Sequence, residues 1–366
     1  MNRRHLVWNT TALAALAVNP GWARAAAQSA KAAGFYFPIE SAPHARTFMQ
    51  WPSSVEIYGD QKTLREVQSS IADIANAIQK FEPVVLLAGP DQSAAARILL
   101  EKNVALWPVP TQDLWCRDAG PSFVINGKGQ LAVTELNFNG WGNKQEHRDD
   151  SLVAENVVTR MGLSLFNSGV VGEGGGLETD GAGTLLAHAS SWVNPNRNAG
   201  TQDQIGKLLL DSFGAEKIIW APGVKGEDIT DYHIDALARF VKPGQVVIQL
   251  PEQLDENDPW STAAFETYDI LKSATDANGR KLEIVVMPEP VNIRSTDENF
   301  VASYVNYYVC NGAVISAQFG DEVTDAKAAT ILKQLYPNRE IIMLNVDPIG
   351  QAGGGIHCST QQQPAV

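Results

Sequence analysis

The chain has 366 residues, of which 44% are hydrophobic and 19% are charged. This is enough apolar material to bury a large core, in one big domain or in two ordinary ones. The formal net charge of −13 at pH 7 argues against nucleic acid and against anionic membrane surfaces as partners, whereas it suits a small cationic substrate through long-range attraction.

The amino-terminal residues have the features of an export signal. Two consecutive arginines, Arg3 and Arg4, precede a short apolar run over residues 10–18, and small residues at 23–27 offer a cleavage site. Because the run is too short to span a bilayer, we expect cleavage and no stable membrane anchor. The pattern predicts a twin-arginine-type signal peptide over residues 1–27 and a periplasmic mature protein. The alternative is a fortuitous basic and alanine-rich tail.

From residue 34 onward, strand and helix patterns alternate. Residues 47–52 are predicted to form a buried strand that ends at a proline, and residues 61–80 place apolar side chains at helical spacing along one face. A second strand over 83–88 and a second helix over 92–102 follow. We therefore expect an α/β fold, with a single catalytic domain over residues 34–366.

A hairpin pattern then occurs four times. Residues 121–134 form two short apolar runs around Asn126-Gly127, the strongest short-range hairpin signal. Comparable pairs of runs cover residues 177–187, 238–250 and 304–316. The helices predicted after them cover residues 150–161, 201–213, 263–274 and 326–335. The repeat of roughly 55 to 70 residues is longer than the common solenoid periods. Since units of this size cannot bury their own apolar faces, we expect them to close into a ring around one axis.

The cysteine pattern favours a reactive thiol. Cys116, Cys310 and Cys358 are odd in number and widely spaced, so we expect no disulfide framework, no metal and no cofactor. Cys358 is the best candidate nucleophile because it follows three glycines at 353–355, which allow the backbone to approach a ligand. The alternative is that Cys358 is simply a small buried hydrophobic residue.

Polar residues stand before or within the hairpins and at the end of the chain. Equivalent positions of successive units meet at the axis of a ring, so we expect these side chains to converge. They are Asp118, Glu173, His233, Asp235, Asn306 and Cys358.

The chain resembles the agmatine deiminase family, which also contains the bacterial type of peptidyl-arginine deiminase. The likeness runs from about residue 49 to residue 364. The motifs that carry it are WCRDAGPSFV, EGGGLETDGAGTLL, NPNRN, DYHIDALARFVKPG, ASYVNYYVCNGAVI and GGGIHCSTQQQP. The resemblance implies the pentein fold, an α/β-propeller of five ββαβ-like units around a pseudo-fivefold axis. It also implies hydrolysis of a guanidinium group without a cofactor.

The resemblance assigns a role to each residue of the polar set. Asp118 and Asp235 would accept N–H bonds from the planar guanidinium, and Cys358 would attack its carbon as the thiolate. His233 would act as general acid and base, with Glu173 orienting its ring. The implied reaction converts agmatine to N-carbamoylputrescine and ammonia through a covalent amidino-cysteine.

Residues beside these motifs have less specific expectations. Trp115 either lies along the alkyl arm of the substrate or belongs to the core, and Asn306 either contacts the substrate or holds the nucleophile loop. Gly355 is expected at the substrate. Arg117 is expected to form a structural ion pair. We expect His357 to bond to backbone and to point away from Cys358, because adjacent side chains of an extended segment face opposite sides.

Several other functions compete with this reading. The same fold could act on peptidyl arginine or free arginine, and the sequence does not decide among these guanidines. A cysteine peptidase would use Cys358 and His233 but would not need the two aspartates. A metallohydrolase lacks the usual ligand spacings. A non-catalytic periplasmic protein could bind polyamines or arginine. The protein could also assemble as a homo-oligomer.

Overall fold

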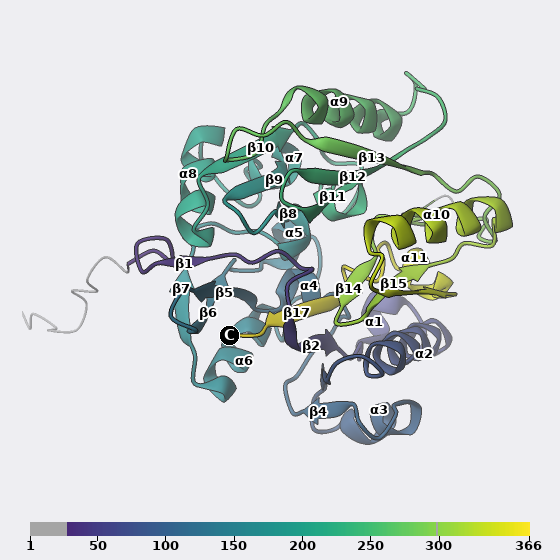
Figure 1. The fold of residues 1–366 in the computed structure, drawn as a ribbon. Helices are drawn as coiled ribbons and strands as arrows, with labels where there is room; N and C mark the ends of the chain where they lie inside the picture. Colours follow the sequence, from purple (N-terminus) through teal and green to yellow (C-terminus); the bar gives the residue numbers. More distant parts are fainter. Residues whose placement is uncertain (1–27, 298) are drawn as a thin grey trace, which may run out of the picture.

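The computed structural model describes residues 28–297 and 299–366. The predicted signal peptide over residues 1–27 lies outside the described residues. Within the described residues the fold consists of five small sheets, which Figure 1 shows arranged around a common centre with the longer helices on the outside.

Four successive units share one plan: two antiparallel strands, a helix, and a strand parallel to the second. The first of them has β5 (Ser122–Asn126), β6 (Leu131–Glu135), α6 (Val153–Met161) and β7 (Ser164–Asn167). The next has β8 (Leu177–Thr179), β9 (Thr184–His188), α8 (Gln202–Phe213) and β10 (Lys217–Ala221). Then come β11 (Ala238–Lys242), β12 (Gln245–Leu250), α9 (Pro259–Ser273) and β13 (Glu283–Pro288). The last has β14 (Tyr308–Cys310), β15 (Ala313–Ala317), α10 (Glu322–Leu335) and β16 (Glu340–Leu344).

The remaining sheet joins the two ends of the described chain. Its sequence-local part is β2 (His44–Gln50), α2 (Gln61–Ile78), β3 (Val84–Leu87), α3 (Ser93–Leu99) and β4 (Ala105–Trp107). The missing antiparallel strand is β17 (Thr360–Pro364), which pairs Thr360 with Met49 and Gln361 with Phe48. The chain end therefore closes the ring, and the five ββαβ-like units predicted from the sequence are present.

Shorter elements connect these units. They are β1 (Phe35–Tyr36), α1 (Val55–Tyr58), α4 (Cys116–Ala119), α5 (Gly140–Asn143), η1 (Asp150–Leu152), η2 (Gly174–Gly176), α7 (Ala189–Trp192), η3 (Ile234–Ala236) and α11 (Asp347–Gln351). The strand β1 pairs with β5, so the segment before β2 is bound to the sheet of β5, β6 and β7.

The predicted helices form where apolar residues recur at helical spacing. In α2 the residues Leu64, Val67, Ile71 and Ile74 are buried on one face, and Asp60 caps the helix by accepting the backbone N–H groups of residues 62 and 63. The strand β17 was not expected. Its five residues are polar or proline, yet all are buried, because ring closure places them between neighbouring sheets.

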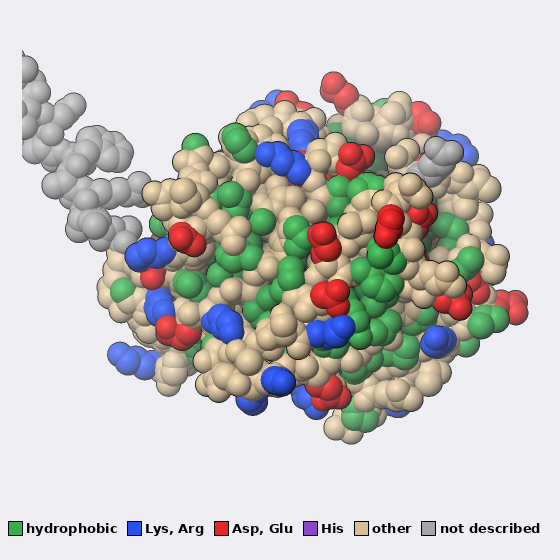
Figure 2. Space-filling view, turned by 90° about the horizontal axis from the view of Figure 1, so that it is seen from above, with side chains coloured by type: hydrophobic (Ala, Val, Ile, Leu, Met, Phe, Trp, Pro, Cys, Tyr) green, Lys and Arg blue, Asp and Glu red, His purple; other side chains and the backbone are tan. Residues whose placement is uncertain are grey.

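The surface mixes charges of both signs. Figure 2 shows one face on which basic and acidic side chains are interspersed with hydrophobic ones, so the net negative charge does not form a single patch there. Among the described residues, none of the helices combines the length and the apolar character needed to cross a bilayer.

Candidate active site

Five loops carry polar side chains to the axis of the ring. Each loop stands before the strand that begins a ββαβ-like unit, namely β5, β8, β11, β14 or β17. The side chains are buried, and hydrogen bonds link each loop to at least one other. The structure therefore brings together Asp118, Glu173, His233, Asp235, Asn306 and Cys358.

The Cys358 thiol is 9% exposed and has two polar neighbours. The amide Nδ2 of Asn306 donates to Sγ at 3.1 Å, and Sγ lies 3.5 Å from Oδ2 of Asp235. Burial raises the pKa of the thiol well above its ordinary value, and the carboxylates of Asp235 and Asp118 raise it further. The free protein therefore holds Cys358 as a thiol, and a cation is needed to ionise it.

The imidazole of His233 lies between two carboxylates. Its Nε2 is 3.2 Å from Oε2 of Glu173, and its Nδ1 is 3.6 Å from Oδ1 of Asp118. Burial by itself disfavours the charged ring, but the two carboxylates outweigh burial and raise the pKa of His233 to about 9. His233 is therefore an imidazolium at neutral pH.

Asp118 is held by two N–H donors. The backbone N–H of Gly175 donates to Oδ1 at 3.0 Å, and the indole N–H of Trp141 donates to Oδ2 at 2.9 Å. Burial raises the pKa of Asp118 to about 6, although the neighbouring His233 cation opposes this shift. The carboxylate is therefore ionised at neutral pH, and its plane is fixed.

The two oxygens of Asp235 have different surroundings. Oδ2 accepts a hydrogen bond from Nδ1 of His357 at 2.7 Å, whereas the buried Oδ1 has no hydrogen-bond partner. Burial alone would raise the pKa of this carboxyl, but His357 holds it below its ordinary value. An ionised oxygen that is buried and unpaired costs free energy, so Oδ1 is a ready position for a donor from a ligand.

These groups meet around a glycine. A Cβ atom on Gly175 would lie 2.8 Å from Oδ1 of Asp118, 2.8 Å from Nδ1 of His233 and 3.1 Å from Oδ2 of Asp235. Any side chain at this position would push the carboxylates and the imidazole apart. Residue 175 must therefore be glycine for the site to form in this way.

The expectation for His357 is wrong. Its side chain bonds to Asp235 and not to backbone, and both His357 and Cys358 reach the same carboxylate oxygen, Oδ2. The rule of opposite faces fails because residues 356–359 form a turn and not an extended segment. Arg117 behaves as expected, since it forms a buried ion pair with Glu40 at 3.0 Å.

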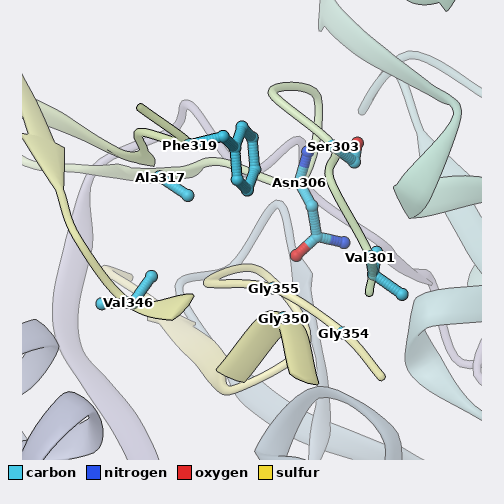
Figure 3. Close-up of a pocket in the computed structure, with 9 residues that line it drawn as sticks. All are labelled: Val301, Ser303, Asn306, Ala317, Phe319, Val346, Gly350, Gly354 and Gly355. Carbon is cyan, nitrogen blue, oxygen red and sulfur yellow. Dashed lines mark hydrogen bonds between the residues drawn. The ribbon is translucent and has the colours of Figure 1, made fainter. Parts of the chain in front are cut away.

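Asn306 holds the nucleophile loop. In addition to its bond to the thiol, its Oδ1 accepts the backbone N–H of Cys358 at 3.3 Å. Gly355 packs directly against it, because a Cβ there would lie 2.4 Å from Oδ1 of Asn306. Figure 3 shows this contact beside a cavity of about 10 Å³, lined by Val301, Ser303, Asn306, Ala317, Phe319, Val346, Gly350, Gly354 and Gly355.

A family model described as Porphyromonas-type peptidyl-arginine deiminase matches residues 36–364. The chain belongs to this family. The agmatine deiminase of Ectopseudomonas mendocina is 33% identical over 362 residues, which are 92% of this chain and 97% of the relative.

Solved structures of family relatives share the fold. The agmatine deiminase of Enterococcus faecalis superposes with a TM-score of 0.86 at 28% identity and covers 93% of this chain and 98% of that chain. A cysteine-to-serine variant of the C. jejuni agmatine deiminase with substrate bound gives 0.79 at 26% identity, over 90% and 96% of the two chains. The fold of this family member is the pentein α/β-propeller, as the resemblance implied.

In this member of the deiminase family, Trp115 forms a wall beside the thiol. A Cβ on Gly354 would lie 2.5 Å from the indole ring of Trp115 and 3.4 Å from Sγ of Cys358. The indole is also part of the largest hydrophobic core. Trp115 therefore borders the nucleophile with one part of its surface and packs in the core with the rest.

Two supporting residues of the deiminase were missed. One is Trp141, whose indole N–H donates to Asp118 and whose backbone has a positive φ of 55°. The other is Arg197, whose Nε donates to both oxygens of Glu173 at 2.7 and 3.0 Å and whose Nη1 donates to Asp231 at 2.7 Å. The flanking glycines of Trp141 and the NPNRN motif of Arg197 were the available signals. Neither signal says which distant carboxylate the side chain meets.

The backbone before His233 is strained. Asp231 and Tyr232 have φ of 58° and 69°, in a region that residues other than glycine seldom adopt. The carboxylate of Asp231 is held by Arg197 and by Lys144, each of which contacts Oδ2. These ion pairs stabilise the conformation that aims His233 at the axis.

The other two cysteines have unreactive surroundings. Cys116 and Cys310 are free and buried, and burial raises the pKa of each thiol well above its ordinary value. Within residues 28–297 and 299–366, no group of His, Cys, Asp and Glu side chains is arranged to hold a metal ion.

Proposed function

We propose that this protein hydrolyses agmatine to N-carbamoylputrescine and ammonia through a covalent amidino-cysteine. The observation that carries the proposal is the placement of the Cys358 thiol beside the buried carboxylate of Asp235, whose other oxygen is unpaired. The relatives named agmatine deiminase support agmatine as the guanidine.

The two aspartates suit a planar cation. Oδ1 of Asp235 is free to accept an N–H bond, and the oxygens of Asp118 each accept one bond and have lone pairs left for another. Charge-assisted hydrogen bonds that a guanidinium donates to two carboxylates fix its plane as well as its position. Its carbon would then face Sγ of Cys358.

Substrate binding activates the nucleophile. The buried thiol is neutral in the free protein, and a guanidinium beside it supplies the positive charge that favours the thiolate. The thiol proton passes to solvent water as the substrate binds, and the thiolate attacks the guanidino carbon, so that a C–S bond forms while the C–N double bond opens to a tetrahedral adduct. Activation that depends on the substrate protects the thiol from other reactions when the site is empty.

His233 serves both halves of the reaction. As an imidazolium it protonates the departing nitrogen, the C–N bond breaks, and ammonia leaves behind an amidino-cysteine. The neutral imidazole then takes a proton from water, whose oxygen attacks the same carbon. In the collapse of the second adduct the C–S bond breaks and the hydroxyl proton passes to the departing sulfur, which releases the ureido product and the Cys358 thiol. Glu173 keeps the ring oriented throughout.

The rival functions fit the site less well. A cysteine peptidase needs donors for an oxyanion, whereas the thiol here faces the carboxylate of Asp235. A protein that only captures polyamines has no use for a buried thiol or for an imidazolium next to it. Peptidyl arginine and free arginine remain alternative substrates of the same chemistry.

The activity should depend on pH in a bell shape. We expect kcat/KM for agmatine to fall below pH about 6, where Asp118 gains a proton and loses its charge, and above pH about 9, where His233 loses the proton it must donate. Ammonia release measured from pH 5 to 10 checks this. A rate that continues to rise through pH 10 would instead identify a free thiolate as the reactive form.

The substrate is tested by offering the purified protein agmatine, arginine and an arginine peptide separately. Ammonia from agmatine supports the proposal. Ammonia from only one of the other guanidines keeps the mechanism and changes the substrate. Tight agmatine binding without ammonia from any of them would favour a capture protein.

We also propose that the protein is exported and acts on external agmatine in the periplasm. The proposal rests on the paired arginines, Arg3 and Arg4, and on the short apolar run that follows them. Hydrolysis of external agmatine to N-carbamoylputrescine would supply a precursor for putrescine. Cell fractionation tests this, and activity found only in the cytoplasm would contradict it.

A further inference from the structure

The imidazole of His357 links Asp235 to a second buried carboxylate. Its Nδ1 is 2.7 Å from Oδ2 of Asp235, and its Nε2 is 2.8 Å from Oε2 of Glu40. A neutral imidazole has one N–H and could donate to only one of these carboxylates. The ring therefore bridges two buried carboxylates, with one nitrogen at hydrogen-bonding distance from each.

Glu40 is a fixed anchor for this ring. It lies between β1 and β2, and its carboxylate receives Arg117 at 3.0 Å, Arg239 at 3.0 Å and the backbone N–H of Val309 at 2.8 Å. Burial by itself would raise the pKa of Glu40, but Arg239, His357 and Arg117 hold it well below its ordinary value. Glu40 is thus a permanent anion tied to three other segments of the chain.

His357 belongs to a buried network of acidic and basic side chains. Arg239 also donates to Glu178 at 2.9 Å, and Glu178 lies 3.8 Å from Nε2 of His357. The network contains three acidic side chains, Glu40, Glu178 and Asp235, and three basic ones, Arg117, Arg239 and His357. Removal of the imidazole would leave Oδ2 of Asp235 and Oε2 of Glu40 each without one of their polar partners in a buried site, which is costly.

We propose that His357, anchored by Glu40, is a positioning residue for substrate binding. By occupying Oδ2 of Asp235 it fixes the carboxylate plane, so that the unpaired Oδ1 is presented to the guanidinium. This inference rests on the proposed function and adds to it a residue that acts through Asp235. Without His357, the fully buried Asp235 would be free to rotate or to take up a proton, and either change removes a bond to the substrate.

We expect the loss of His357 to weaken substrate binding more than it slows the chemical steps. The bond between Asp235 and the guanidinium is made when the substrate binds and persists into the transition state, so its loss raises KM more than it lowers kcat. A residue that merely stabilised the fold would instead lower the amount of active protein and leave KM unchanged.

Two uncharged replacements of His357 test the contact of Nδ1 with Asp235 separately from the contact of Nε2 with Glu40. In asparagine, the amide nitrogen is bonded to Cγ, as Nδ1 is in histidine, so His357→Asn keeps a donor toward Asp235. In glutamine, the amide nitrogen lies one bond farther out, as Nε2 does, so His357→Gln keeps a donor toward Glu40 only. The two variants differ in which carboxylate keeps a donor, so the difference between them reports the N–H bond to Asp235.

We expect His357→Gln to raise KM for agmatine about 10- to 100-fold, the effect of losing one charge-assisted hydrogen bond. His357→Asn should stay much closer to the wild type, and kcat should change less than KM in both. The dissociation constant of agmatine, measured by calorimetry in the Cys358→Ser background, should follow the same order without turnover.

The matched control is His44→Gln. His44 is also buried and bonds through Nδ1 to a glutamate, Glu82. Its Nε2 lies 2.6 Å from the backbone carbonyl of Glu40, and glutamine keeps a donor at that position. We expect it to lower the melting temperature and to leave KM unchanged. Equal KM values in the wild type, His357→Asn and His357→Gln would overturn the inference, as would an equal rise in His44→Gln. A wild type that releases ammonia from no guanidine would overturn the proposed function itself.

Discussion

A Cys358→Ser variant is expected to release ammonia from agmatine at least about 10⁴-fold more slowly than the wild type, the scale on which loss of a nucleophile acts in other hydrolases. The physical reason is that a serine hydroxyl ionises far less readily than a thiol, and the guanidinium next to it cannot make up the difference. Ammonia release under saturating agmatine is the measurement.

The matched control for this variant is Cys310→Ser. Cys310 is also a free, buried cysteine, but it lies in β14 and its thiol donates to the carbonyl of Ala313. We expect Cys310→Ser to keep its activity. Full activity in Cys358→Ser would rule out the thiol as nucleophile, whereas agmatine binding without turnover would support the assignment.

A His233→Gln variant is expected to lower kcat roughly 10²- to 10⁴-fold, the usual contribution of a general acid and base. Its loss affects both the departure of ammonia and the attack of water. If the second step suffers more, an amidino adduct on Cys358 will accumulate, and mass spectrometry of the protein stopped during turnover will detect it.

His188→Asn is the control for His233. His188 is a buried histidine whose Nδ1 bonds to the carbonyl of Tyr232 at 2.9 Å, next to the site but outside it. Asparagine keeps a nitrogen at the Nδ1 position, so activity should remain near that of the wild type. An equal loss in both variants would show that the loop, and not the imidazole of His233, is what the reaction needs.

Local sequence patterns were enough to predict the repeating units and the polar set. The helices and hairpins were predicted because their signals are local: apolar spacing in α2, or an Asn-Gly turn between β5 and β6. The position of each polar residue before a hairpin followed from the same local reading. The convergence of these polar side chains at one site then followed from the expectation that the units form a ring.

The contacts between these side chains could not be predicted from local patterns, because they join distant parts of the chain. The buried polar strand β17 has no local signal, because its burial comes from pairing with β2 at the other end of the chain. The contacts of His357 with Asp235 and Glu40 span more than one hundred residues, and a turn replaced the extended backbone that the sequence suggested. Contacts of this kind depend on ring closure, which no stretch of sequence contains.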